Sequence, residues 1–224
     1  GAGSLTFSSL LRSALNVGTV QASAYGDAVA NITTSPTTGA YTGITVGAPV
    51  VSVTYDDVSN RVTRVITTGG ARQVAGYVEG VSFGGTVDVG ELDVRFNYAA
   101  DGSVSGEIYG NVVGKSLAGV EVNFIGQKLF DIAGTKNSSG AVILQPIVGS
   151  TAFNLGSTTT ALNGLKITDA GFSAISTALD LDELGINSLN AAAKNFGNIS
   201  STINVAAVAA IPEPSTYALM GLGL

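Results

Sequence analysis

Apolar and small polar residues alternate along the middle of this chain, from residue 40 to residue 129, and this pattern restricts the fold more than any other. Ile44 and Val46, and then Val51 and Val53, stand at every second position between small polar residues. Successive side chains of an extended strand point to opposite faces, so a period of two gives one apolar face and one polar face. We therefore predict antiparallel β-structure over this region.

Turn residues divide the alternating region into hairpins. Asp56–Asn60 separates the apolar run that ends at Tyr55 from the strand-like run Arg61–Thr67, and Gly69 and Gly70 then interrupt the pattern. Asp, Asn and Ser stabilise turns through hydrogen bonds from their side chains to the nearby backbone. The first predicted hairpin therefore joins residues 51–55 to residues 61–67.

A second hairpin is predicted from Leu92–Tyr98 and Ser103–Tyr109, which are joined through Asp101 and Gly102. An Asp-Gly pair between alternating runs is a strong hairpin signal. The register predicts a buried face made of Leu92, Val94, Phe96, Tyr98, Val104 and Ile108. Asp93, Arg95, Asn97, Ser105 and Glu107 are predicted to face water.

The composition agrees with a β-rich fold. The 224 residues include 30 Gly, 7 Tyr, 8 Phe and one Met, which favours strands and turns over long helices. Hydrophobic residues make up 45%, whereas the 12% of charged residues is about half the usual share. We predict a mainly β fold, an antiparallel β-sandwich or a small barrel with short C-terminal helices.

Helical spacing begins near Thr168. Apolar residues follow at three- and four-residue intervals, and Thr168 or Asp169 is suited to cap the helix. Asp180 and Glu183 have the spacing of a capping box, and Gly185 is predicted to end that short turn before a further helical stretch. Residues 203–211 fit a strand or a helix.

The first residues are apolar and almost uncharged. Residues 1–54 contain only two charged side chains, Arg12 and Asp27. The segment around Leu5 and Phe7 resembles a strand, and Leu10–Leu15 fits one or two helical turns, so the periodicity is ambiguous. This arm either packs on its own domain or inserts into a neighbouring subunit.

These patterns divide the chain into four parts. We predict an N-terminal arm over residues 1–39, an antiparallel β domain over 40–167, a helical portion over 168–210 and a terminal signal over 211–224. Gly1–Ser4 lacks a start methionine and a basic region before a hydrophobic core, so we expect that an export peptide has been removed.

The chain has no Cys and no His. Disulfides, thiol nucleophiles, imidazole bases and nearly all zinc or copper sites are therefore excluded. Carboxylates remain at Asp56-Asp57 and at Asp180, Asp182 and Glu183, where turn formation and helix capping explain them better than glycoside hydrolysis or calcium binding. No Ser-x-x-Lys pattern provides an activated serine. We predict a protein that is not an enzyme, without catalytic residue, cofactor or metal site, and leave calcium at the second cluster open.

Four tyrosines and the net charge of the chain indicate which binding partners are to be expected. Tyr25, Tyr41, Tyr77 and Tyr109 could stack on sugar rings or could serve core and interface packing. The 10 basic and 16 acidic residues give a formal charge of -6, which disfavours nucleic acid as a partner.

The C-terminal sequence Ile-Pro-Glu-Pro-Ser-Thr-Tyr-Ala-Leu-Met, from Ile211 to Met220, places Pro212, Glu213 and Pro214 before an apolar run. It resembles the PEP-CTERM sorting signal of exosortase-processed bacterial proteins, in which Pro-Glu-Pro precedes a membrane helix and an arginine-rich tail. The apolar run here has about eight residues where a membrane helix needs roughly twenty, and no arginine follows.

This resemblance implies a Gram-negative bacterium and an encounter with exosortase during export. It also implies transient retention at the inner membrane, followed by secretion to the cell surface or the extracellular matrix. It implies nothing about a chemical activity.

Low charge, apolar termini and the lack of catalytic groups together favour a structural role. We hypothesise a secreted subunit of an extracellular filament or biofilm matrix, whose partners are copies of itself and, in addition, exopolysaccharide. The predicted assembly contacts are Leu5, Phe7, Leu10, Leu11, Leu15, Val205, Val208 and Leu219. The alternative is a cell-surface module that binds a glycan or another ligand without catalysis.

Overall fold

The computed structural model describes residues 1–56, 58, 61–100, 104–132, 156–162 and 164–205. Within these ranges, twelve strands form one sheet and three helices accompany it. The strands are β1 Ala2–Phe7, β2 Gln21–Tyr25, β3 Val29–Thr34, β4 Tyr41–Asp56, β5 Arg61–Thr67, β6 Gly70–Ala75, β7 Gly85–Tyr98, β8 Val104–Ser116, β9 Glu121–Ile132, β10 Gly156–Leu162, β11 Leu165–Ile167 and β12 Gly197–Val205. The helices are α1 Ser9–Val17, α2 Asp169–Ala178 and α3 Glu183–Ala192.

The sheet is antiparallel and curls into a nearly closed barrel. Its strand order is β10-β12-β1-β4-β5-β7-β8-β9-β11, with β3 added to β4 and with β2 joined through β6 to β7. Near the closing side, the amide of Phe196 donates to the carbonyl of Leu165 at 2.7 Å. The prediction of a mainly β, sandwiched or barrel-like antiparallel fold is confirmed.

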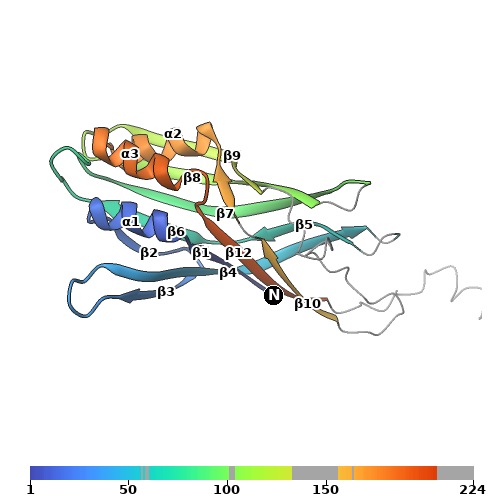
Figure 1. Ribbon diagram of the computed structural model, residues 1–224. Coiled ribbons are helices and arrows are strands. Elements are labelled where there is room, and N and C mark those ends of the chain that lie inside the picture. The colour runs from blue at the N-terminus through green and yellow to red at the C-terminus, as the bar shows by residue number, and fades with distance from the viewer. Residues whose placement is uncertain (57, 59–60, 101–103, 133–155, 163, 206–224) are drawn as a thin grey trace, which may run out of the picture.

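Two opposed layers make up the barrel, and they are named here by their charge (Figure 1). The neutral layer consists of β3, the first half of β4, β1, β12 and β10. The charged layer consists of β5, β7, β8 and β9, with β6 on its flank. Figure 1 shows the helices gathered at one end of the barrel, away from the free end of β10.

Long strands that change partners connect the two layers. The first half of β4 pairs with β1 and β3, and its second half pairs with β5. Pro49 lies at this change, where the lack of an amide donor disturbs the ladder least. In β7, Glu91 adopts a φ of 52° at the shift between the part that pairs with β6 and the part that pairs with β5. This irregularity is a β-bulge that bends the strand.

The predicted break at Gly69 and Gly70 is confirmed. Gly69 has a φ of 76°, and a Cβ there would lie 2.7 Å from the amide nitrogen of Ala28. A Cβ on Gly70 would lie 2.0 Å from the carbonyl oxygen of Val89. Only glycine allows the chain to pass from β5 into β6 this close to neighbouring backbone.

Both predicted hairpins are present. β4 pairs with β5 from Val50 to Asp56, and β7 pairs with β8 in a register that places Val94 opposite Ile108. The predicted inner face is buried at Val94, Phe96, Val104 and Ile108 and partly buried at Leu92 and Tyr98. The predicted outer residues do face outward, but the Asp93 side chain is only 13% exposed because two arginines cover it.

The N-terminal arm forms a strand and then a helix, which explains its mixed periodicity. β1 lies between β4 and β12, and the Ser8 hydroxyl caps α1 by accepting a hydrogen bond from the Leu11 amide at 3.0 Å. The arm packs on its own domain, and Leu11 and Leu15 are both buried there.

In the C-terminal helices, the predicted cap of α2 is confirmed at Thr168, whose hydroxyl accepts from the Gly171 amide at 3.2 Å. The predicted capping box is wrong, because Asp182 caps α3 and Asp180 takes a φ of 48° before it. Gly185 does not end this helix but lies within its first turn, where a Cβ would be 2.1 Å from the Val81 carbonyl oxygen.

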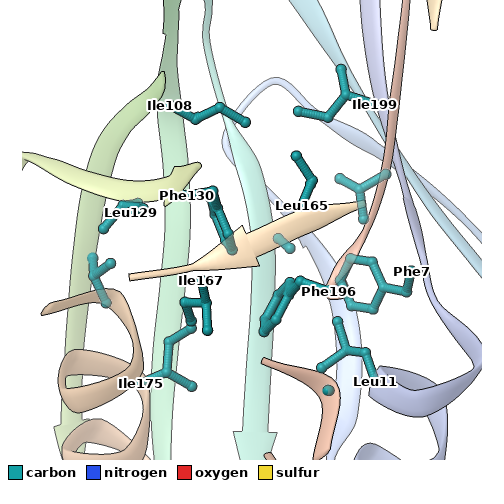
Figure 2. Close-up of a cluster of buried hydrophobic side chains, with 14 of the residues drawn as sticks. Phe7, Leu11, Ile108, Leu129, Phe130, Leu165, Ile167, Ile175, Phe196 and Ile199 are labelled. Carbon is teal, nitrogen blue, oxygen red and sulfur yellow. The ribbon is translucent and has the colours of Figure 1, made fainter. Parts of the chain in front are cut away.

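The core lies between the layers and is closed at one end by the helices. Phe7, Phe130 and Phe196 meet there, as Figure 2 shows, and the Phe130 and Phe196 rings are 5.1 Å apart. These aromatic rings come from β1, β9 and the segment before β12. The described residues of the predicted arm (1–39) and helical portion (168–205 of 168–210) thus contribute strands and helices to the same core as the described residues of 40–167.

Candidate assembly surface

Charge is segregated between the two layers. Strands β1, β3, β10 and β12 contain no charged residue, and the only one in β4 is its last residue, Asp56. In the charged layer, by contrast, β7 alone carries Asp88, Glu91, Asp93 and Arg95. The sequence alone indicated uncharged stretches, but the pairing of strands distant in sequence places them side by side.

The outer face of the neutral layer consists of small uncharged side chains in lateral rows. One row runs Ser200, Ser4, Gly47 and Val29 across four neighbouring strands, and the next runs Asn198, Thr6, Thr45 and Asn31. The hydroxyls of Ser4 and Ser200 lie 2.8 Å apart, and those of Thr6 and Thr45 lie 3.1 Å apart. These hydroxyl groups satisfy one another, so covering this face with another surface has a low desolvation cost.

Within the described residues, the neutral layer also ends in two edge strands. Among the described residues, β3 pairs with β4 alone and β10 pairs with β12 alone. Unpaired backbone amides and carbonyls at a sheet edge can hydrogen-bond to a further strand. The layer therefore offers two edges, one on each side.

The charged layer, in contrast, neutralises its own charges in an outward-facing network. Asp93 on β7 accepts hydrogen bonds from Arg64 on β5 at 2.7 and 2.9 Å and from Arg95 at 2.7 and 3.0 Å. Burial by itself would raise the pKa of Asp93, but the hydrogen bonds from the two arginines outweigh it and lower this pKa.

The network continues across β8 and β9. The Arg95 guanidinium carbon lies 4.1 Å from the Tyr109 ring centroid, within cation–π range. Lys128 contacts Glu107 at 2.8 Å and Asp131 at 2.7 Å. Hydrogen bonds to Asp131 and Glu107 raise the pKa of Lys128, and the bond from Lys128 lowers the pKa of Glu107. The network holds three cations and three anions, so it leaves no net charge to attract an ionic ligand.

The interior offers little room for a ligand. A cavity of about 60 Å³ lies between the layers, lined by apolar residues that include Val46, Val94 and Phe130. Ligand pockets of small molecules usually measure about 300–1,000 Å³. No buried polar side-chain atom lacks a hydrogen-bond partner in the described part of the chain. This interior cavity is therefore smaller than a usual small-molecule pocket.

A separate exposed apolar surface, the apolar end, lies beside the helices. It consists of Tyr77, Phe83, Leu117 and Leu184, which are 66%, 51%, 72% and 56% exposed. Backbone hydrogen bonds hold its segments together, from Leu117 to the Gly84 carbonyl at 2.9 Å and from Leu184 to the Gly80 carbonyl at 3.0 Å. Exposed apolar residues grouped in this way indicate an interaction site.

The structure places four of the eight predicted assembly residues in or against the chain's own core. Phe7, Leu11 and Leu15 are buried in the chain's own core, and Leu5 is packed partly against it. Leu10 is exposed on α1. Buried side chains cannot contact a second copy without an exchange of the whole arm, so the outer face of the same layer is the better candidate.

The remaining predicted residues lie at or beyond the end of the described chain. β12 ends at Val205. Val208, Leu219 and the motif residues Pro212, Glu213 and Pro214 lie outside the described residues. Their predicted roles in assembly and sorting stay predictions.

Two of the acidic residues considered as candidate sites have local structural roles, Asp56 in a turn and Asp182 at a helix cap. Asp56 accepts a hydrogen bond from the Val58 amide at 2.8 Å, and Asp57 lies outside the described residues. Asp182 accepts from the Glu183 amide at 2.8 Å. Within the described ranges, no three acidic side chains come together as they would around a metal ion.

The four tyrosines do not form one groove. Tyr41 accepts a hydrogen bond from the Ala22 amide at 3.1 Å, and Arg72 and Arg95 lie over the rings of Tyr25 and Tyr109. Tyr77 pairs with Phe83, with ring centroids 6.2 Å apart. Only Tyr77 is thus presented to solvent as a largely open aromatic ring.

A scan against protein-family models, a search of curated proteins and a search of solved structures each found no significant match. Of the helices in the described ranges, none has the length and apolar character needed to cross a membrane.

Proposed function

We propose that this protein is a secreted structural subunit that assembles with copies of itself into an extracellular filament or matrix. The observation that carries the proposal is the neutral layer, which has an uncharged outer face and, among the described residues, two edge strands, β3 and β10. A chain that had only to remain soluble would distribute charge over both layers. Secretion and delivery to the cell surface rest on the resemblance of the C-terminal motif.

The neutral layer supports assembly in two ways. Its outer face can contact another surface without removing a charged group from water. Desolvation of a charge is the largest free-energy cost when polar surfaces come into contact. Its two edges lie on opposite sides of the layer, so contacts at both do not exclude one another. A subunit with two independent contacts can extend into an open chain. This version replaces contact through the buried side chains of the arm.

The test is self-association of the purified protein, followed by sedimentation velocity over a range of concentrations and by electron microscopy. We expect assemblies that persist from about 50 to about 500 mM salt, because screening weakens only contacts between charges. Thr6→Lys on the neutral face should weaken association at least about tenfold, since lysine must be desolvated there. A protein that stays monomeric at high concentration would refute the proposal.

Asn97→Lys provides the matched control. Asn97 is exposed on β7 in the charged layer, so the same new charge lies on the opposite side of the barrel. It should leave assembly unchanged. Equal effects of the two lysines would show that net charge, and not the neutral face, controls association.

A second candidate function is supported by the apolar end. Tyr77 and Phe83 present exposed aromatic surface, and aromatic rings bind sugar rings through their apolar faces. A surface module that binds a glycan, such as exopolysaccharide, would use this site as a monomer. Saturable binding on a glycan array that Tyr77→Ala abolishes and Val113→Ala preserves would favour this function over assembly.

A further inference from the structure

The β3 edge has the features of a strand that pairs with another strand. Within the described chain, β3 is hydrogen-bonded on one side only, to β4. Val29, Asn31 and Thr33 are exposed along it, and Val29 is 73% exposed. An open backbone edge next to an exposed valine can gain both hydrogen bonds and apolar burial from a partner strand.

The usual protections of an edge strand are missing from β3. Edges are commonly blocked by charged residues, proline or a bulge that turns the edge away. Residues 28–55 carry no charge, and the strand Val29–Thr34 contains no proline. Its one irregularity lies at the far end, between Thr33 and Thr34. Five of its six residues therefore present a regular backbone.

A second copy of β3 is the partner that this edge fits best. When two copies pair antiparallel about a two-fold axis, each residue meets either itself or a nearby residue of the same strand. A charged edge would then place like charges opposite one another, which is unfavourable. The uncharged edge of β3 avoids this repulsion. In a register centred on Asn31, Val29 of each copy lies opposite Thr33 of the other.

We propose that β3 of one molecule pairs antiparallel with β3 of a second molecule, about a two-fold axis at Asn31. The inference rests on the proposed self-assembly and specifies its first contact. The pairing joins the two neutral layers into one continuous sheet. Asp27 of each copy then lies opposite Ser35 of the other, away from its own symmetry mate.

Disulfide trapping tests this geometry directly, because the chain contains no cysteine. Paired residues in adjacent antiparallel strands are about 4.5–5.5 Å apart at Cα, within disulfide range. Asn31→Cys should give a covalent dimer under mild oxidation. Val29→Cys and Thr33→Cys should each dimerise poorly alone and efficiently when mixed, because these two positions face each other across the axis.

Asn123→Cys is the matched control. Asn123 is exposed on β9 in the charged layer. The control therefore makes the same Asn-to-Cys change at an exposed position outside β3. Circular dichroism and the melting temperature of each reduced variant verify that it is folded. Asn31→Lys, which places two lysines opposite each other, should raise the dissociation constant at least about tenfold.

The outcomes separate the two proposals. Native protein that associates while Asn31→Cys crosslinks no more than Asn123→Cys would overturn the β3 contact and leave self-assembly standing. Native protein that does not associate would overturn both. Trapping by Thr33→Cys alone, without the mixed pair, would overturn the register centred on Asn31.

Discussion

The neutral layer and the charged layer share one core but treat their outer faces in opposite ways. In the charged layer, ion pairs join side chains on neighbouring strands, as in the Arg64–Asp93 contact at 2.7 Å. In the neutral layer, hydrogen bonds between hydroxyl groups join neighbouring strands, as between Ser4 and Ser200. Paired charges bind water strongly, whereas paired hydroxyls give up water at lower cost. The comparison shows how one small barrel can present a solvated side and a side suited to contact.

The largest expected effect tests whether the two layers depend on a single core. Phe130→Ala removes a buried ring that packs against Phe196 from the opposite side of the barrel, and should cost about 3–5 kcal/mol of unfolding free energy. Chemical denaturation followed by fluorescence or circular dichroism measures this cost. Phe124→Ala, at a ring 40% exposed on the same strand, should cost less than about 1 kcal/mol. Similar losses would mean that the layers do not meet at Phe130.

A smaller effect tests the ion-pair network of the charged layer. Asp93→Ala leaves Arg64 and Arg95 side by side without their shared carboxylate. Because both arginines are nearly half exposed, solvent screening limits the expected loss to about 1 kcal/mol. Glu121→Ala, which removes an exposed ion pair with Lys115, should leave the melting temperature unchanged. Neither change should alter self-association, since both lie outside the neutral layer.

The smallest effect is a dependence of stability on pH. The pKa values of Asp93 and Glu107 are lowered in the fold, so their contribution is complete above the ordinary values of 3.8 and 4.5 and disappears as pH falls through the lowered values. The raised pKa of Lys128 gives a contribution that is complete below 10.5 and is lost at higher pH. Melting temperatures should therefore be nearly constant from about pH 5 to about pH 10.

The control for this prediction is Asp93→Asn, which should flatten the acid side of the profile. Self-association should change little over the same range, because β1, β3, β10, β12 and the first half of β4 contain no charged side chain. An assembly that dissociates between about pH 5 and about pH 10 would place charged groups in the contact.

Local patterns in the sequence predicted the hairpins but not the layers. Strands β7 and β8 are close in sequence, and their alternation gave the faces of Val94, Phe96 and Ile108 correctly. The predicted turn residues Asp101 and Gly102 lie outside the described residues. The contact between β1 and β12 joins residues up to 200 positions apart, as in Ala2 with Thr202. No local periodicity encodes such a pairing. The neutral layer could therefore not be predicted from the sequence, although the sequence shows that its segments are uncharged.

The candidate site was predicted only in part for the same reason. The sequence left open whether the arm packs on its own domain or inserts into a neighbouring subunit, because the strands that flank residues 2–7 are distant in sequence. Phe7 is buried because β4 and β12 flank its strand and Phe196 comes close to it. The wrong role predicted for Gly185 has a similar origin. Glycine is required at this position by the close approach of the Val81 carbonyl, and not because a helix ends there.

The position of β1 between β4 and β12 sets an order of events during biosynthesis. Residues 2–7 are synthesised long before residues 197–205, and the barrel cannot close until both are present. Among the described residues β10 pairs only with β12, so that side of the described sheet also waits for β12. A chain synthesised only as far as residue 196 therefore lacks a complete neutral layer. Under the proposed self-assembly, recruitment of further copies must wait until β12 has been made.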